Sequence, residues 1–113
     1  MRHVQPTVYL VAADAEQRKR VGATLATIAR VIAFGCPQSF LECSDIADYA
    51  CVVVTLTLDG MTAVQFVRAA PQTLPVVVLG GGGDGDIGLA LELMRAGAAD
   101  YIDQAQDPRR LRA

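Results

Sequence analysis

The feature that most constrains the fold is an apolar stretch near the middle of the chain, from Cys51 to Ala63. It reads Cys-Val-Val-Val-Thr-Leu-Thr-Leu-Asp-Gly-Met-Thr-Ala. Four consecutive apolar residues without alternation are typical of a strand that is covered on both faces, and β-branched Val and Thr favour the extended state. The stretch then turns polar, so the carboxyl end of this strand is predicted to open into a loop, where open α/β sheets place their sites.

Strand and helix signals alternate along the rest of the chain. Short β-prone apolar segments predict strands over 7–11, 30–34, 49–55, 74–79 and 99–102. Between them, helices are predicted after Asp14 and over 37–42, 61–70 and 87–96. A last helix is expected to start at Asp107 and Pro108 and to be truncated at Ala113.

The first helix is the clearest amphipathic segment. Asp14 stands where an N-cap residue would. Apolar residues at helical spacing, Val21, Leu25 and Ile28, are predicted to face the core. Its outer face is expected to carry the charged residues Glu16, Arg18, Lys19 and Arg20.

Alternation of strands and helices with short connections predicts a parallel sheet with helices on both faces. For a chain of 113 residues, the natural arrangement is a flavodoxin-like, doubly wound α/β fold with three α/β/α layers and strand order 2-1-3-4-5. Nothing marks an internal linker, so residues 1–113 are expected to form a single domain.

Composition excludes several classes of function. The net charge is −2, so no basic footprint for nucleic acid or anionic membrane is present. No run has the length of a signal peptide core or a membrane span, and a soluble cytoplasmic domain is expected. Three cysteines without Cys-x-x-Cys spacing and a single histidine argue against structural disulfides and metal binding.

Several segments together resemble a known family. They are Val-Tyr-Leu-Val at 8–11, Ser-Phe-Leu-Glu at 39–42, Leu-x-Leu-x-Gly-Met at 56–61, Leu-Pro-Val-Val-Val-Leu at 74–79 and Met-Arg-Ala-Gly-Ala-Ala-Asp-Tyr-Ile at 94–102. The chain resembles the receiver domain of bacterial two-component response regulators, which has a CheY-like fold. The phrase at 34–42 most resembles receivers that precede a helix-turn-helix transcription effector, so an effector domain is expected to follow in the full-length protein.

The resemblance implies a phosphorylation site, but every reactive position has changed. The acidic pair that holds Mg²⁺ matches Ala12 and Ala13, and the phosphate-accepting Asp matches Thr55. The hydroxyl residue matches Gly80, and the Lys matches Gln104. Alanine supplies no carboxylate for Mg²⁺, and an unactivated threonine hydroxyl is a poor phosphate acceptor. We therefore expect a degenerate receiver, or pseudo-receiver, with no enzymatic activity, metal or cofactor.

Two other features have both a functional and a structural interpretation. Asp14 and Asp59 lie near the expected site, but helix capping and a turn with Gly60 account for them better than a weak cation site. The glycine-rich segment 80–86 is expected to be a loop, with Asp86 capping the helix that follows. That carboxylate disfavours an anion, and a small effector there is the alternative.

The resemblance also implies a surface for association. Tyr101 matches an aromatic position that turns inward in responsive receivers, and here it is expected to be either a fixed surface aromatic or partly buried. Arg95 and Asp100 resemble positions that form ion pairs between subunits, with Arg110 among the arginines that could pair with them. Alternatively, these are solvated charges.

We expect a non-enzymatic module of transcription regulation that associates, independently of phosphorylation, as a homodimer or with a partner regulator or kinase. The alternative is a sensor that binds a small molecule in the crevice around Ala12, Thr55 and the glycine-rich loop. An FMN-dependent enzyme is disfavoured, because no aromatic residue flanks the expected site.

Overall fold

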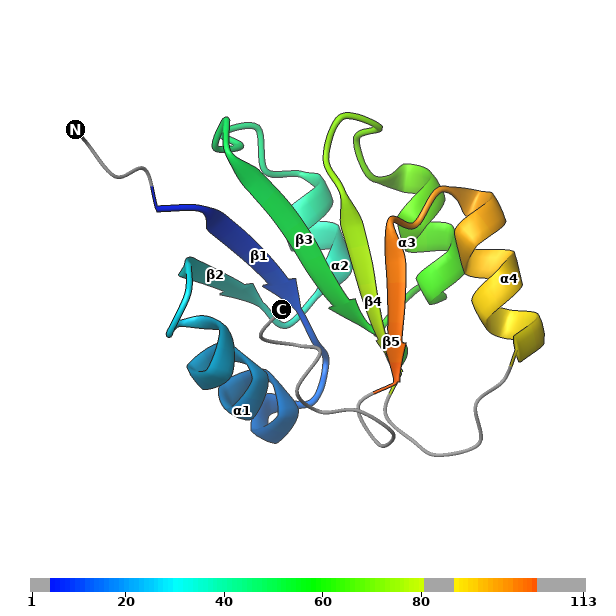
Figure 1. Ribbon diagram of the computed structural model, residues 1–113, viewed down its shortest axis with the longest axis horizontal. Helices are drawn as coiled ribbons and strands as arrows, with labels where there is room; N and C mark the ends of the chain where they lie inside the picture. Colours follow the sequence, from blue (N-terminus) through cyan, green and yellow to red (C-terminus); the bar gives the residue numbers. More distant parts are fainter. Residues whose placement is uncertain (1–4, 81–86, 104–113) are drawn as a thin grey trace.

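A five-stranded parallel sheet forms the centre of the protein (Figure 1). The computed structural model describes residues 5–80 and 87–103. The elements follow one another as β1 (Thr7–Val11), α1 (Ala15–Leu25), β2 (Arg30–Phe34), α2 (Pro37–Leu41), β3 (Ala50–Thr55), α3 (Ala63–Ala69), β4 (Val76–Gly80), α4 (Ile87–Ala96) and β5 (Asp100–Asp103). The strand order is β2-β1-β3-β4-β5, as the sequence predicts.

Burial along the strands follows their place in the sheet. All five residues of β1 are buried, and so are Val52 to Thr55 of β3, because both strands have a neighbour on each side. The edge strand β2 contains no fully buried residue. Continuous apolar runs therefore mark the central strands, which is the usual signature of a parallel sheet with both faces covered.

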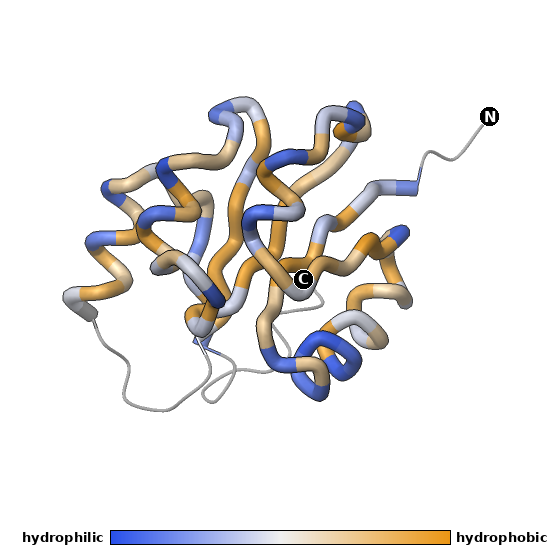
Figure 2. Tube along the Cα trace, turned by 180° about the vertical axis from the view of Figure 1, so that it is seen from behind, coloured by the Kyte–Doolittle hydropathy of each residue, from blue (hydrophilic) through white to orange (hydrophobic). Residues whose placement is uncertain are grey.

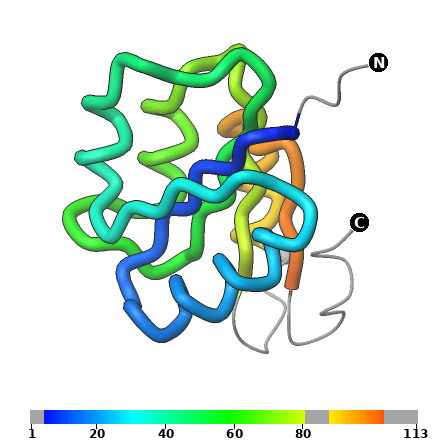
Figure 3. Tube along the Cα trace, turned by 90° about the vertical axis from the view of Figure 1, so that its left-hand side faces the viewer, coloured from blue at the N-terminus to red at the C-terminus, as the bar shows by residue number. Residues whose placement is uncertain are grey.

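Helices cover the sheet from two sides, as Figure 3 shows edge-on. On one face, Val21 and Leu25 of α1 pack against β1, β3, Leu79 and Ile102. On the other face, α2, α3 and α4 contribute to a larger cluster. At its centre the Phe40 ring lies 5.4 Å from Tyr9, 5.6 Å from Phe34 and 5.8 Å from Phe66, measured between ring centroids. In Figure 2 the sheet is largely orange and the polar residues lie on the outer surface and in the loops.

The first helix ends earlier than predicted. It stops at Leu25, and Ile28 is 47% exposed instead of facing the core. The turn that follows uses Thr27, whose hydroxyl donates to the carbonyl of Thr24 at 2.7 Å, and Ala29 is buried in place of Ile28. The apolar spacing typical of a helix continues in the sequence beyond Leu25, where the helix itself has ended. The predicted role of Ile28 in the core was therefore wrong.

Other boundaries differ by a few residues. Gly80 is the last residue of β4, whereas the sequence predicted that it begins the following loop, and this was wrong. The helix predicted over 61–70 begins after an N-cap at Thr62, which forms a capping box with Gln65. Residues 81–86, including the predicted cap Asp86, lie outside the described residues, and so does the helix predicted from Asp107. Within the described part, no helix is long and apolar enough to cross a membrane.

Candidate functional site

The strands are parallel, so their carboxyl ends meet along one edge of the sheet, toward which all five arrowheads point in Figure 1. The register places Val11 opposite Val54, and Thr55 opposite Leu79. Ala12, Thr55 and Gly80 therefore lie at the ends of neighbouring strands, as predicted. The other two positions named from the sequence at this end of the chain, Gln104 and Arg110, lie outside the described residues.

Thr55, the last residue of β3, is almost completely buried, with 1% of its surface exposed. Its hydroxyl donates a hydrogen bond of 3.3 Å to the carbonyl oxygen of Thr57. This bond, between residues two apart in the chain, closes a local turn. A threonine hydroxyl engaged in this way is neither exposed to a donor nor activated as a nucleophile.

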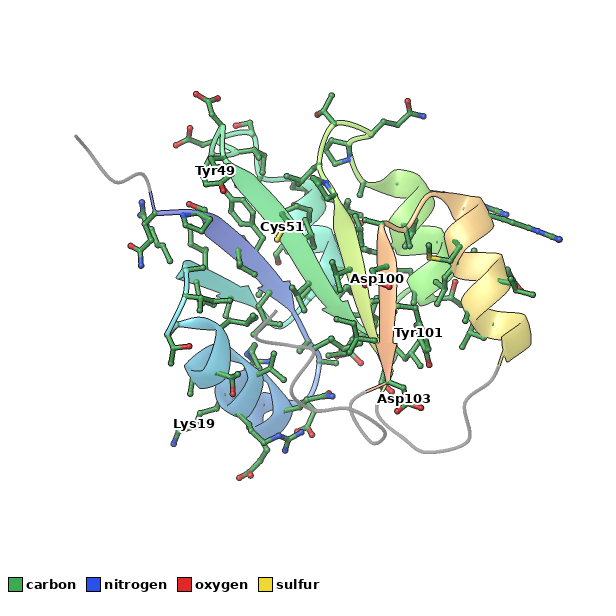
Figure 4. All side chains as sticks on the ribbon, viewed as in Figure 1. Lys19, Tyr49, Cys51, Asp100, Tyr101 and Asp103 are labelled. Carbon is green, nitrogen blue, oxygen red and sulfur yellow. The ribbon has the colours of Figure 1, made fainter. Side chains whose placement is uncertain are left out.

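The end of β1 is covered by a charged side chain. Ala12 is fully buried and Ala13 is partly buried. Nη1 of Arg18, from the first turns of α1, donates to the carbonyl oxygen of Ala12 at 2.8 Å and lies 3.4 Å from that of Ala13. We expected Arg18 on the outer face of the helix, and this was wrong: the side chain is partly buried and folds back over the strand end. The neighbouring Lys19 extends into solvent as predicted (Figure 4).

At the end of β4, a tyrosine ring occupies the space that a side chain at position 80 would need. A Cβ atom added to Gly80 would collide with the hydroxyl of Tyr101 and would lie 2.7 Å from its Cζ. Gly80 has no positive φ that would call for glycine, so space and not backbone geometry accounts for it. Tyr101 is partly buried against the larger core cluster, which fits the second of the two roles predicted for it.

Among the described residues, the donor groups at this edge do not fit a divalent metal ion. Mg²⁺ keeps its waters and needs carboxylates to hold it. Asp14 is exposed and acts as the N-cap of α1, where its carboxylate accepts from the backbone N–H of Glu16 at 3.1 Å. Asp59 is exposed in a turn with Gly60, whose φ is +88°. Within residues 5–80 and 87–103, no three His, Cys, Asp or Glu side chains are grouped closely enough to hold a metal.

The cysteines add no chemistry to this edge. All three are free thiols. Burial raises the pKa of the Cys51 thiol above its ordinary value, so the group is held in its neutral form at physiological pH. Cys51 stands near the start of β3, away from the carboxyl end (Figure 4).

An apolar groove lies beside the end of β3. It has a volume of about 330 Å³ and is lined by the loop after β3, the start of α3 and one residue of α4: Leu56, Thr57, Leu58, Met61, Thr62, Ala63, Val64 and Leu89. Of the crevice predicted around Ala12, Thr55 and the glycine-rich loop, Ala12 and Thr55 are buried, and residues 81–86 of the loop lie outside the described residues.

The predicted association surface is divided between α4 and β5. Arg95 is exposed in the last turn of α4, and Asp100 begins β5, where its carboxylate accepts from the backbone N–H of Tyr101 at 2.8 Å (Figure 4). Two large apolar side chains of α4 also point outward, with Leu91 54% and Met94 44% exposed. Sequence reasoning missed these two, although apolar residues around most of α4, interrupted by Glu92 and Arg95, were the available signal.

Comparisons with known proteins give a consistent result. No protein family model matches the sequence. The transcriptional regulatory protein FixJ of Bradyrhizobium diazoefficiens is 29% identical over 108 residues, which cover 94% of this chain and 53% of the relative. This chain thus spans about half the length of the curated relative that it matches.

Solved structures extend this likeness to the fold. The crystal structure of FixJ-N is similar with a TM-score of 0.76 and 26% identity, covering 88% of this chain and 82% of that one. The BeF3-activated DrrB receiver domain has a TM-score of 0.79 at 23% identity, covering 96% of this chain and 92% of that one.

Proposed function

We propose that this chain, a response regulator receiver domain in its fold and its sequence similarity, is a degenerate receiver that signals by association and without phosphorylation. Its similarity to a transcriptional regulatory protein supports a role in transcription regulation. The domain has no enzymatic activity in this proposal and needs no cofactor. The observation that carries it is Thr55, a neutral and buried side chain at the end of β3, beside a strand end that Arg18 covers.

Phosphoryl transfer to a receiver needs an ionised acceptor and neutralisation of the phosphoryl charge by metal and cationic groups. Thr55 lacks the first requirement, and Ala12 and Ala13 supply no side chain for the second. With Gly80 in place of a hydroxyl residue, a bound phosphoryl group would also have no hydroxyl at β4 to hold it. Each of these positions independently supports a mode of action that does not use phosphate.

The partner is either a second copy of the chain or another regulator or kinase, bound through the surface of α4 and β5. Leu91 and Met94 supply exposed apolar area there, and Arg95 supplies charge beside them. An isologous dimer would bring the same patch together twice, which suits a surface with both apolar and charged groups. We include Asp100, Tyr101 and Arg110 in this proposed interface.

We expect no stoichiometric modification when the protein is incubated with Mg²⁺ and acetyl phosphate, because Thr55 is not a carboxylate acceptor and Ala12 and Ala13 offer no ligand to Mg²⁺. Intact-mass spectrometry measures the phosphorylated fraction, and ¹⁹F NMR detects bound beryllofluoride. The DrrB receiver domain, whose structure is described as BeF3-activated, is the positive control in the second experiment. One phosphoryl group per chain at any residue, or stoichiometric beryllofluoride, would contradict the proposal.

A second candidate function, sensing of a small molecule, is favoured by the groove of about 330 Å³ beside β3. Its lining is mainly apolar, which suits an apolar effector. For this function we expect a saturable rise in Tm with one member of a panel of apolar metabolites, since a ligand that binds only the folded state stabilises it. Met61→Glu, which places a charge in the groove, should abolish that rise, whereas Gln72→Glu, outside the groove, should not. A panel without any saturable shift would count against sensing.

A further inference from the structure

The side chain of Arg18 takes up a position that its place in the sequence does not require. It begins in the first turns of α1, between exposed Lys19 and partly buried Gln17, and turns toward the end of β1. There Nη1 donates to the carbonyl oxygen of Ala12 at 2.8 Å and approaches that of Ala13 at 3.4 Å. Hydrogen bonds from a charged donor are stronger than neutral ones, so this contact holds the loop between β1 and α1 against the helix.

Gly35 is the second half of this arrangement. It follows β2 directly, and a Cβ atom there would lie 3.0 Å from Nη1 and 3.4 Å from Cζ of Arg18. Its φ is not positive, so the backbone does not require glycine at this position. The missing side chain leaves room for the guanidinium to lie across the ends of β1 and β2.

The guanidinium of Arg18 lies near the start of α1, where the helix dipole disfavours a positive charge. The start of a helix carries partial positive charge, so a cation near its first turn is disfavoured unless other groups compensate it. Here the carbonyl oxygens of Ala12 and Ala13 provide the compensation. In the receiver family that the chain resembles, the positions of Ala12 and Ala13 hold carboxylates that bind the metal. Here both side chains are methyl groups.

We infer that Arg18 is a built-in cation that occupies and closes the end of β1, and that Gly35 is the residue that makes room for it. The guanidinium of Arg18 thus stabilises this edge of the sheet, and the stability of the fold does not depend on a divalent metal ion. The role of Arg18 concerns the fold of this edge, so it is independent of the way in which the domain signals.

The test compares Arg18→Ala with Lys19→Ala, the exposed neighbour on the same helix. We expect Arg18→Ala to lower Tm by about 3 to 8 °C and Lys19→Ala by about 2 °C or less. Hydrogen exchange adds a local readout, because the backbone N–H of Ala12 donates to the carbonyl of Phe34 at 3.0 Å. Arg18→Ala should accelerate exchange at Ala12 and leave exchange in β4 unchanged.

Gly35→Ala distinguishes a specific contact with Arg18 from a general loss of stability. In the wild-type background the added methyl group must displace the guanidinium, and Tm should fall. In the Arg18→Ala background nothing remains to be displaced, so the same change should leave Tm unaltered or raise it. An equal loss in both backgrounds would overturn the inference, as would unchanged exchange at Ala12 in Arg18→Ala.

The third experiment tests whether a divalent metal ion stabilises the protein. Titration of the wild-type protein with MgCl₂, against NaCl at matched ionic strength, should leave Tm unchanged. A saturable rise of Tm with MgCl₂ alone would show that a divalent ion binds and stabilises the fold, and would overturn the assignment of Arg18 as the cation of this edge.

Discussion

Replacing Thr55 by aspartate is expected to destabilise the domain by about 3 kcal/mol or more at neutral pH, because it buries a charge without a partner. Thr55 is 1% exposed, and its hydroxyl donates to the carbonyl of Thr57. An ionised carboxylate cannot donate that bond and would face the carbonyl oxygen instead. Although the substitution restores the acceptor of the receiver family, we expect no phosphorylation by acetyl phosphate, since the metal-binding side chains are still missing.

The destabilisation of Thr55→Asp should depend on pH in a defined direction. Burial raises the pKa of a carboxyl group above its value in the unfolded chain. The loss of stability is therefore complete above the folded-state pKa and shrinks as the pH falls toward the unfolded-state pKa. Urea denaturation at a series of pH values, each relative to the wild type, measures this difference.

Thr55→Val is the matched control, because it keeps the branched shape and removes the hydroxyl. We expect it to change stability by about 1 kcal/mol, with no pH dependence of its own. If Thr55→Asp were as stable as the wild type at neutral pH, or gained a phosphoryl group in the presence of Mg²⁺, the account of this edge as a neutral and metal-free site would be wrong.

Replacing Gly80 by threonine is expected to force the ring of Tyr101 out of its present position. The Cβ atom would overlap the phenol, and the phenol is the far end of a side chain that can rotate away. We expect a loss of about 1 to 3 kcal/mol, as for other overpacked sites, together with a changed surface on β5. If β5 takes part in association, the concentration dependence of the molar mass in sedimentation equilibrium will change as well.

The background Tyr101→Ala separates the collision from other effects of the new residue. In that background Gly80→Thr should cost little, because the atoms that it would meet are absent. Chemical shifts of the Tyr101 ring in NMR spectra report its displacement directly. A ring that keeps its shifts in Gly80→Thr, with a loss of stability that is the same in both backgrounds, would refute this interpretation of Gly80.

The sheet was predictable from sequence because its signals are local and redundant. The strands β1, β3 and β4 are short β-prone runs, and Asp14 caps α1 as its position indicates. The capping box of Thr62 and Gln65 was readable as Thr-x-x-Gln before an apolar run, but was not identified. Ile28 was misplaced because periodicity does not show where a helix stops.

The candidate site was predictable only in part. Comparison of the sequence with the receiver pattern identifies which side chains are missing at Ala12, Thr55 and Gly80, because this needs only the residue at each position. Which side chains lie at these positions instead depends on the tertiary structure. Arg18 folds back from the adjacent helix α1, and Tyr101 comes from β5. The sequence clue to both is glycine, at Gly35 and Gly80, where their side chains lie.

The place of β1 in the sheet has a consequence for biosynthesis. Its neighbours are β2 on one side and β3 on the other, and its contact with β3 pairs Thr7 with Ala50. At about 5 to 20 residues added per second, Thr7–Val11 leaves the ribosome seconds before Ala50–Thr55 does. A strand whose five residues are all buried in the folded protein thus spends that interval with one hydrogen-bonding edge unpaired, and this interval is when chaperones would be of most use to it.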